Sequence, residues 1–376
     1  MTTQPAHQPK LILRSAADVA ASVPYLLGFA PTSSIVLVFF DVDQRHVLTA
    51  RIGWPTPADL SQPCLALVIE TCRSARGNGA DGAQVVLYPP ASRPPSLHTE
   101  TVCAVADSMR GTEIALRCLG TIADGFWRDL LDLPGQAEQL NDSGLSASCQ
   151  WVANGISYLP DRQSLVERID GDPTTTCIRL TAALQVSGGE GYAPAMSRAR
   201  DRRAIEDAIY NYLLPADIPP TLDTPDVQLQ LPPDAHILRW ALALADRRIR
   251  EPLLWRFAQV TPETDGAGRQ ALAGLSLLVR HTPDPVIAAL ASCAAALAWQ
   301  QGNGALAQIA AERGLKADPR NVLCKLVFKA VEQGVHPSIW VEMLNSMTLH
   351  ELRSGRMQSG MSGTGTRSKY VRDCPG

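Results

Sequence analysis

The sequence predicts an α/β protein in two parts, an N-terminal domain with a mixed sheet and a C-terminal domain made only of helices. Within the first 130 residues, short runs rich in β-branched residues alternate with segments of helical periodicity. Such alternation is typical of helices layered on a sheet. Six prolines follow between residues 215 and 233, and beyond them only helical patterns recur. The domain boundary is therefore expected in that proline-rich stretch.

The first elements are a short strand at residues 10–14 and a helix that starts after Ser15. Ser15 and Asp18 have the spacing of a capping box, in which the serine hydroxyl accepts from the Asp18 amide and the carboxylate returns the bond. The helix is expected to end near Pro24, because a proline disfavours helical geometry in the residue before it.

A β-hairpin and two strand–helix repeats follow. Residues 34–40 are apolar and rich in β-branched side chains, which predicts a strand buried on both faces. Residues 46–52 alternate and are expected to return antiparallel. The remaining elements of this half are helices at 58–75 and 98–109 and strands at 84–88 and 113–122. Together these elements predict a mixed sheet covered by helices.

Weaker signals lead from residue 128 to the boundary, and clear helical ones follow it. The elements expected before the boundary are a helix at 163–168, a strand at 176–180 and a helix at 197–214. Beyond the boundary, Pro252 is expected to start a helix. The later helices are predicted at 266–281, 284–300, 304–317, 321–334 and 337–352.

These elements define five regions. They are a flexible N-terminus (1–10), an α/β domain (11–214), a proline-rich linker (215–233), a helical domain (234–352) and a disordered tail (353–376). The tail is predicted to be disordered because it is rich in glycine, serine and threonine.

Residues 299–319 resemble the second half of a tetratricopeptide repeat. Gly302 falls in the turn between paired helices, and Ala307 and Gly314 lie where small residues let the helices approach closely. Ala311 departs from the pattern, since the family prefers a large aromatic residue there. A single repeat is too few for an independent array. The expected fold is therefore a tetratricopeptide-like hairpin inside a small helical domain.

Composition excludes several function classes. Hydrophobic residues make up 45% and charged residues 19% of the 376 residues, and the net charge is −3. Those values predict packed cores and give no clear nucleic-acid signal. The nine cysteines include no CxxC pair, so a zinc knuckle is not indicated and reduced thiols are expected. No apolar stretch has the roughly 20 residues that a membrane span requires. A cytoplasmic protein without a membrane anchor is expected.

Three passages of this chain resemble the actinobacterial domain-of-unknown-function family 4192. They are residues 13–31, the group Asp-Gly-Phe-Trp-Arg at 124–128, and residues 297–305. The resemblance spans roughly residues 11–345. The family brings no assigned activity, cofactor or catalytic residue, so the cofactor is unknown.

Ligands of open α/β sheets bind beyond the carboxyl ends of strands. Those positions are Ser15, Asp41, Pro89 and Asp124. Ser15 is explained by the helix cap. Asp41 and the nearby Asp43 are candidate cation ligands, but acidic residues are ordinary in hairpin turns, and two carboxylates are too few for a metal site. No metal site is predicted.

Residues 124–128 form the most distinctive cluster. Asp124, Trp127 and Arg128 offer a carboxylate, an aromatic ring and a guanidinium, which together can hold a planar ligand by stacking. The alternative is a turn with an aromatic plug on the core. The charged runs at 201–203 and 246–251 leave a similar choice between binding of phosphate or an acidic partner and solvated helix faces with i,i+4 ion pairs.

The sequence leaves enzymatic activity open. It contains neither the zinc-protease spacing HExxH, nor the nucleophile-elbow spacing GxSxG, nor the phosphate loop GxxxxGK[ST]. The first hypothesis is a non-enzymatic interaction or regulatory protein that binds a protein or peptide through its helical domain. The alternative is a small-molecule-binding α/β domain, enzymatic or not, with a pocket at the strand ends near Trp127.

Overall fold

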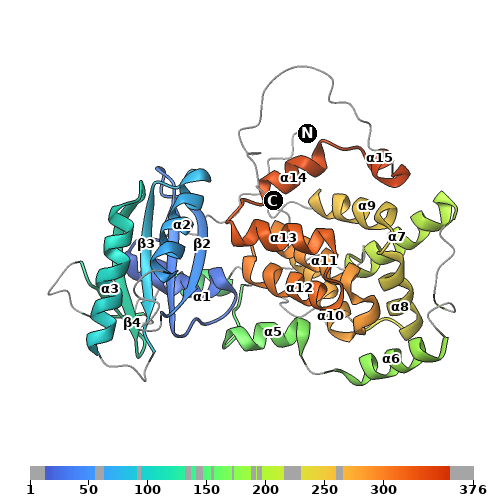
Figure 1. Ribbon diagram of the computed structural model, residues 1–376, viewed down its shortest axis with the longest axis horizontal. Coiled ribbons are helices and arrows are strands. Elements are labelled where there is room, and N and C mark those ends of the chain that lie inside the picture. Colours follow the sequence, from blue (N-terminus) through green and yellow to red (C-terminus); the bar gives the residue numbers. More distant parts are fainter. Residues whose placement is uncertain are drawn as a thin grey trace, which may run out of the picture.

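The computed structural model in Figure 1 describes most of the chain. The described residues are 13–55, 63–90, 95–131, 137–140, 147–153, 156–171, 173–187, 192, 197–215, 230–259 and 266–355. The expected flexible N-terminus, most of the expected linker and almost the whole expected tail lie outside these residues.

A six-stranded mixed sheet occupies the N-terminal part, with strand order β2-β1-β3-β4-β5-β6. The strands are β1 (Ser34–Phe40), β2 (His46–Gly53), β3 (Gly82–Tyr88), β4 (Ala115–Ala123), β5 (Phe126–Asp129) and β6 (Glu138–Gln139). Only β3 and β4 pair in parallel, and the other neighbours are antiparallel. The predicted mixed sheet and α/β class are confirmed.

Helices cover the sheet and make up the rest of the described chain. The first three are α1 (Ala16–Leu27), α2 (Pro63–Gly77) and α3 (Pro95–Arg110), which with the sheet form the α/β part. Next along the chain come α4 (Ala147–Ala153), which contacts α1, and α5 (Arg162–Asp170) and α6 (Thr175–Ser187), which contact helices of the helical part. The helical part consists of α7 (Ala199–Leu213), α8 (Asp234–Ala243), α9 (Arg247–Ala258), α10 (Ala267–His281), α11 (Asp284–Gln300), α12 (Gly304–Ala317), α13 (Val322–Glu332), α14 (Ser338–Asn345) and α15 (Leu349–Ser354).

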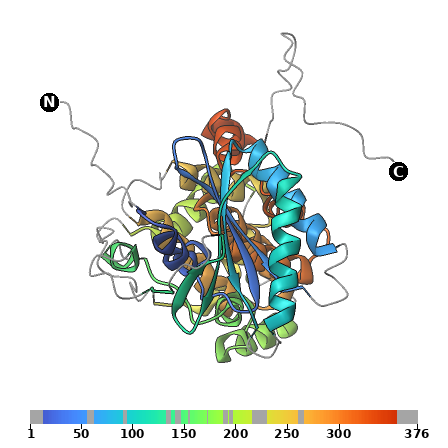
Figure 2. The ribbon, with the colours of Figure 1, turned by 90° about the vertical axis from the view of Figure 1, so that its left-hand side faces the viewer.

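The α/β part has three layers, as Figure 2 shows. Strand β1 is buried along its whole length. Its alternating side chains face two cores, because successive residues of a strand point to opposite faces. Ile35 and Leu37 pack with α2 and α3, and Val36 and Val38 lie in the core that includes α1. The continuous apolar run in the sequence therefore has the expected cause, a strand covered on both faces.

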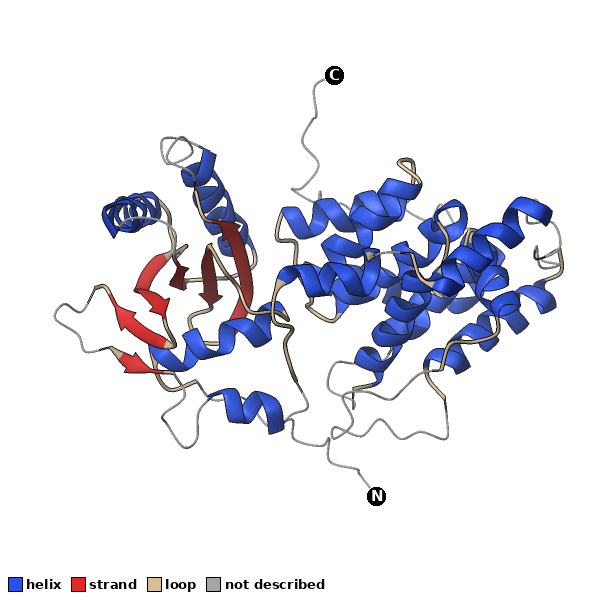
Figure 3. Ribbon diagram, turned by 90° about the horizontal axis from the view of Figure 1, so that it is seen from below, coloured by secondary structure: helices blue, strands red, loops and turns tan. Residues whose placement is uncertain are grey.

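The helical part is built around α11. Most residues of this helix are buried, and it contacts α8, α9, α10, α12, α13 and α14. Figure 3 shows the helices of this part gathered beside the part that contains the strands. A helix that is apolar all round has to be enclosed, and here the alanines of α11 also let its neighbours approach closely. Hydrogen bonds join this part to the α/β part, since Asn78 Nδ2 donates to the Gly334 carbonyl at 2.7 Å and the His336 amide donates to Asn78 Oδ1 at 3.2 Å.

Several expected elements differ from the structure at the N-terminus. Residues 13 and 14 precede α1 without strand pairing, and the rest of the expected first strand lies outside the described residues. Helix α1 runs through Pro24 to Leu27, because Val23 and Leu27 are buried and stabilise the turn around the proline. Ser15 accepts from the Asp18 amide as expected, but the Asp18 carboxylate accepts from the Arg14 amide at 2.8 Å instead of the Ser15 amide.

Three further expectations are wrong. The strand expected at 176–180 lies in α6, where Thr174 Oγ1 accepts from the Cys177 amide at 3.1 Å and so favours a helical start. Pro252 lies inside α9, whose capping residue is Asp246. The single helix expected at 337–352 is two helices, since Thr348 starts α15 with its own capping box.

Candidate functional site

Residues 124–128 form the turn between β4 and β5. Asp124 and Gly125 have φ values of +51° and +82°. Two successive residues with positive φ are typical of a tight two-residue hairpin turn, in which Asp-Gly is favoured. The Trp127 side chain is 3% exposed and belongs to the core on the α1 side of the sheet. Arg128 is exposed, and as the next residue of the strand it points to the opposite face. The structure thus separates Trp127 from Arg128, and their ligand-binding role stays a prediction.

Asp41 lies directly after β1, in the turn to β2. Its Oδ1 accepts from the Arg45 amide at 2.8 Å, and its carbonyl accepts from Arg117 Nη2 at 3.3 Å. The neighbouring Asp43 pairs with Arg45 at 3.3 Å. Both carboxylates therefore stabilise the hairpin turn. Within the described part of the chain, no group of three or more histidine, cysteine or acidic side chains is arranged to hold a metal ion.

An apolar pocket of about 310 Å³ lies at the edge of the sheet where β3 and β4 end. Its lining consists of Trp54, Leu87, Pro89, Thr99, Val102, Thr121 and Leu130. Leu87 belongs to β3 and Thr121 to β4, while Thr99 and Val102 belong to α3, which connects these two strands. Of the four strand-end positions that the sequence analysis named, Pro89 is the one among the described lining residues of this pocket.

Strand register explains how this pocket arises. Ser34 is paired on one side with Gly53 and on the other with Tyr88. The residues that follow those two partners, Trp54 and Pro89, therefore leave the sheet at the same edge. Because β3 and β4 are parallel, Thr121 of β4 lies at that edge as well, paired with Leu87. None of the described residues that line the pocket is ionisable, so it suits an uncharged apolar group.

A second pocket, of about 630 Å³, is polar and lies among the helices. It is bounded by α5, α10 and α12 and by the starts of α6 and α11. Its charged lining residues are Glu167, Asp170, Arg280, Asp284, Arg313 and Lys316. Cys177 also lines it, and burial together with the nearby Asp284 raises the pKa of the Cys177 thiol.

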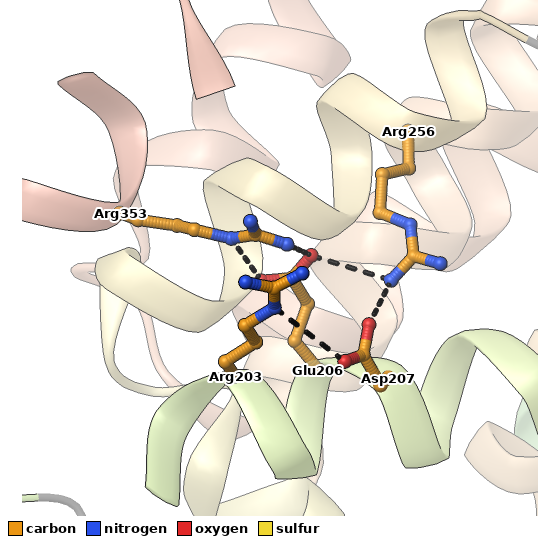
Figure 4. Close-up of polar contacts among 5 residues, drawn as sticks. All are labelled: Arg203, Glu206, Asp207, Arg256 and Arg353. Atoms are coloured by element: carbon orange, nitrogen blue, oxygen red, sulfur yellow. Dashed lines mark hydrogen bonds and ion pairs between the residues drawn. The ribbon is translucent and has the colours of Figure 1, made fainter. Parts of the chain in front are cut away.

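A buried charge cluster holds the last helix against α7 and α9 (Figure 4). Glu206 is 1% exposed and accepts two hydrogen bonds from Arg353, at 2.9 Å from Nε and 2.7 Å from Nη2. Arg256 Nη1 lies 3.3 Å from Glu206 Oε1 and 2.8 Å from Asp207 Oδ1. Arg203 completes the cluster with an i,i+4 pair to Asp207 at 3.8 Å. Each acidic side chain of this cluster forms ion pairs with arginines of the same cluster, which indicates a structural role.

The charged runs at 201–203 and 246–251 contribute to ion pairs within the protein. The pair between Arg203 and Asp207 is of the expected i,i+4 kind. Asp246 accepts from the Arg248 amide and guanidinium at the start of α9, with the closest contact at 2.7 Å. The pKa of the Asp246 carboxyl is lowered by these bonds. What sequence reasoning missed is the burial of Glu206, since its partner Arg353 is far away in the chain.

Residues 77–82 have the glycine spacing GxGxxG, a motif that the interpretation of the sequence wrongly took to be absent. Such glycines bind dinucleotides when they follow a strand and open a helix. Here Gly77 ends α2 and Gly82 begins β3, so the order is reversed. A Cβ atom at Gly82 would lie 2.0 Å from Arg117 Nε, which explains this glycine by close packing.

Comparison with known proteins gives one match. A family model described as "Domain of unknown function (DUF4192)" matches residues 17–338. No curated protein and no solved structure matches the chain. None of the described helices is both long and apolar enough to cross a membrane.

Proposed function

Because the chain belongs to the DUF4192 family, which carries no assigned function, we propose a function from the geometry alone: the protein binds a small molecule in the apolar pocket between β3, β4 and α3. One observation carries the proposal. A pocket of about 310 Å³ lies at the carboxyl ends of the only parallel strand pair in the described sheet. In α/β sheets, ligands bind in the crevice outside those ends.

The lining supports a flat, largely apolar ligand. Ligand pockets are mostly apolar with a few polar groups and have volumes of about 300–1,000 Å³, so this one suits a single ring system. Trp54, Leu87 and Leu130 supply apolar contact, and the Thr121 hydroxyl is a polar group within the lining. Thr121 Oγ1 is 3.4 Å from the Leu87 carbonyl, a long bond that a ligand acceptor can replace.

A thermal-shift screen tests the proposal. A ligand that binds only the folded state raises the apparent melting temperature. The screen should contain nucleobases, nucleosides and other uncharged aromatic metabolites. We expect at least one of them to raise the melting temperature in a dose-dependent way and to change tryptophan fluorescence, because Trp54 lines the pocket.

Two variants of α3 make the screen specific. Val102→Phe places a ring in the pocket and is expected to abolish the ligand's effect. Cys103→Phe is the matched control, because Cys103 is the next residue of the same helix and is exposed. A ligand that stabilises both variants equally would bind elsewhere and contradict the proposal, as would the absence of any stabilising compound.

The interaction hypothesis is kept as a second candidate, supported by apolar side chains on the surface of the helical part. Helix α13 exposes Val322 and Leu326, and α14 exposes Ile339 and Met343, to between 43% and 76%. In each helix the two residues are one turn apart, the spacing of a contact stripe. The partner is proposed to be a protein or peptide. Replacing Leu326 with Asp should abolish any reproducible complex recovered from native lysate, whereas exposed Lys325→Gln should not.

The interaction hypothesis includes two further proposals: a tetratricopeptide-like hairpin formed by α11 and α12, and a division of the chain into an α/β domain and a helical domain. Gly302 has φ +76° in the turn between α11 and α12, and a Cβ atom at Gly314 would lie 3.2 Å from the Ala291 Cβ atom. These features support close pairing of the two helices. Because α11 is enclosed by other helices, we propose that the partner surface lies on α13 and α14.

Limited proteolysis tests whether residues 215–233 form an exposed linker. Cleavage between residues 215 and 233, after an earlier cut beyond residue 354, is the expected order if that segment is an exposed linker. We also propose a cytoplasmic location. The described cysteines are free thiols, as is usual for proteins of a reducing compartment.

A further inference from the structure

The polar pocket of the helical part contains a buried guanidinium that is incompletely bonded. Arg313 of α12 is 8% exposed. Its Nε lies 2.8 Å from Asp170 Oδ1, and its Nη2 donates to Asp284. The remaining nitrogen, Nη1, is buried and has no hydrogen-bond partner among the described residues. Buried donors are almost always paired. An acceptor from a bound ligand would therefore satisfy this nitrogen.

A second guanidinium in the same lining is free of acidic partners. Arg280 Nη1 donates to the Gly171 carbonyl at 3.1 Å, and none of the described acidic residues forms an ion pair with Arg280. Lys316 shares Asp170 with Arg313, at 3.3 Å. Of the three acids among the described lining residues, Asp170 and Asp284 are thus already bonded to Arg313.

The third acid does not neutralise this arrangement at close range. Glu167 lines the pocket, but its side chain is exposed and forms no ion pair with a described residue. The bonding capacity left in the pocket is therefore mainly that of donors: the guanidinium of Arg280, Nη1 of Arg313 and the ammonium of Lys316. A guanidinium offers a planar set of N–H donors that matches the oxygens of carboxylates and phosphates.

We propose that this pocket is a second ligand site, which holds the oxyanion of a small molecule, a carboxylate or a phosphate group, through Arg280 and Arg313. The volume of about 630 Å³ admits a whole small metabolite around the oxyanion. The site does not depend on the apolar pocket, because the two linings share no residue. Cys177 lies in its wall and reports occupancy.

Protection of Cys177 from a maleimide, measured by peptide mass spectrometry, tests the proposal on the full chain. The probes are inorganic phosphate and succinate, with chloride at equal ionic strength as the reference. We expect one of the two to slow the labelling of Cys177 at least threefold while leaving exposed Cys103 and Cys149 unchanged. Protection by phosphate alone assigns a phosphate ligand, and protection by succinate alone assigns a carboxylate.

Two arginine variants make the result specific to the site. Arg280→Gln should raise the half-protecting concentration at least tenfold, because it removes the cation without an acidic partner. Exposed Arg320→Gln, outside the lining, should leave that concentration unchanged. The ratio of labelling with and without anion is compared within each variant, since Arg280 itself lowers the pKa of Cys177. If neither anion protects Cys177 beyond chloride, or if both variants respond alike, the proposal is overturned.

Discussion

Replacing Glu206 with Gln is expected to loosen the docking of α15. Glu206 is 1% exposed, and its carboxylate is the only ion-pair partner of Arg353 among the described residues. Glutamine keeps nearly the same volume, so the change removes a charge without opening a cavity. Arg256 keeps a second carboxylate, Asp207, at 2.8 Å, and is affected less.

The size of the effect follows from how Arg353 is placed. Removing one partner of a buried ion pair typically costs about 3–5 kcal/mol, because an uncompensated charge stays behind. The Arg353 side chain is 26% exposed and can regain part of its hydration. We therefore expect Glu206→Gln to lower the free energy of unfolding by about 2–3 kcal/mol, just below the range for fully buried pairs.

Urea unfolding of a double-mutant cycle measures this value. The cycle compares Glu206→Gln, Arg353→Met and the double variant, and residues that share an ion pair should show a coupling of about 1–3 kcal/mol. Hydrogen exchange should quicken first in α15. Glu342→Gln is the control, since Glu342 is exposed on α14 and surface changes stay within about 0.5 kcal/mol. If Glu206→Gln behaves like this control, or if the two single changes are additive, the cluster does not hold α15.

Three further predictions concern packing and pH. Ala307→Phe should cost about 1–3 kcal/mol by overpacking, because Ala307 is fully buried, whereas Gln308→Phe should change the urea midpoint little. Gly120→Ala should destabilise the protein by a similar amount and alter tryptophan fluorescence, because a Cβ atom there would lie 2.2 Å from the Trp127 indole of β5. Gly53→Ala is the control, because the space around Gly53 is open. Burial raises the pKa of the Cys293 thiol from its ordinary 9.0 to about 12; its neutral form therefore stabilises the fold fully below pH 9, and that contribution should be lost as the pH rises from about 9 to 12. Urea unfolding between pH 7 and 10.5 should accordingly show a weaker pH dependence in Cys293→Ala, and an identical dependence in both proteins would contradict the assignment.

The order of the elements was largely determined by the sequence. The apolar run of β1 and the alternation of β2 predicted the first hairpin, because a covered strand needs apolar residues on both faces. The alanine-rich stretch of α11 predicted a helix, and its lack of a polar face fits the enclosure that the structure adds. The Asp-Gly pair before β5 was a hairpin signal in the sequence, although the cluster around it suggested a ligand site.

Only the tertiary structure decided which side chains meet. Asp170 and Arg313 form one ion pair across 143 positions of sequence, and Glu206 and Arg353 another across 147. A charged residue on a helix has the same local pattern whether it faces water or a distant partner, so burial of its charge depends on how the helices pack. The apolar pocket is decided in the same way. Trp54 and Pro89 meet there because Ser34 pairs with both of the strands that precede them, and strand order is a long-range property that no local periodicity encodes.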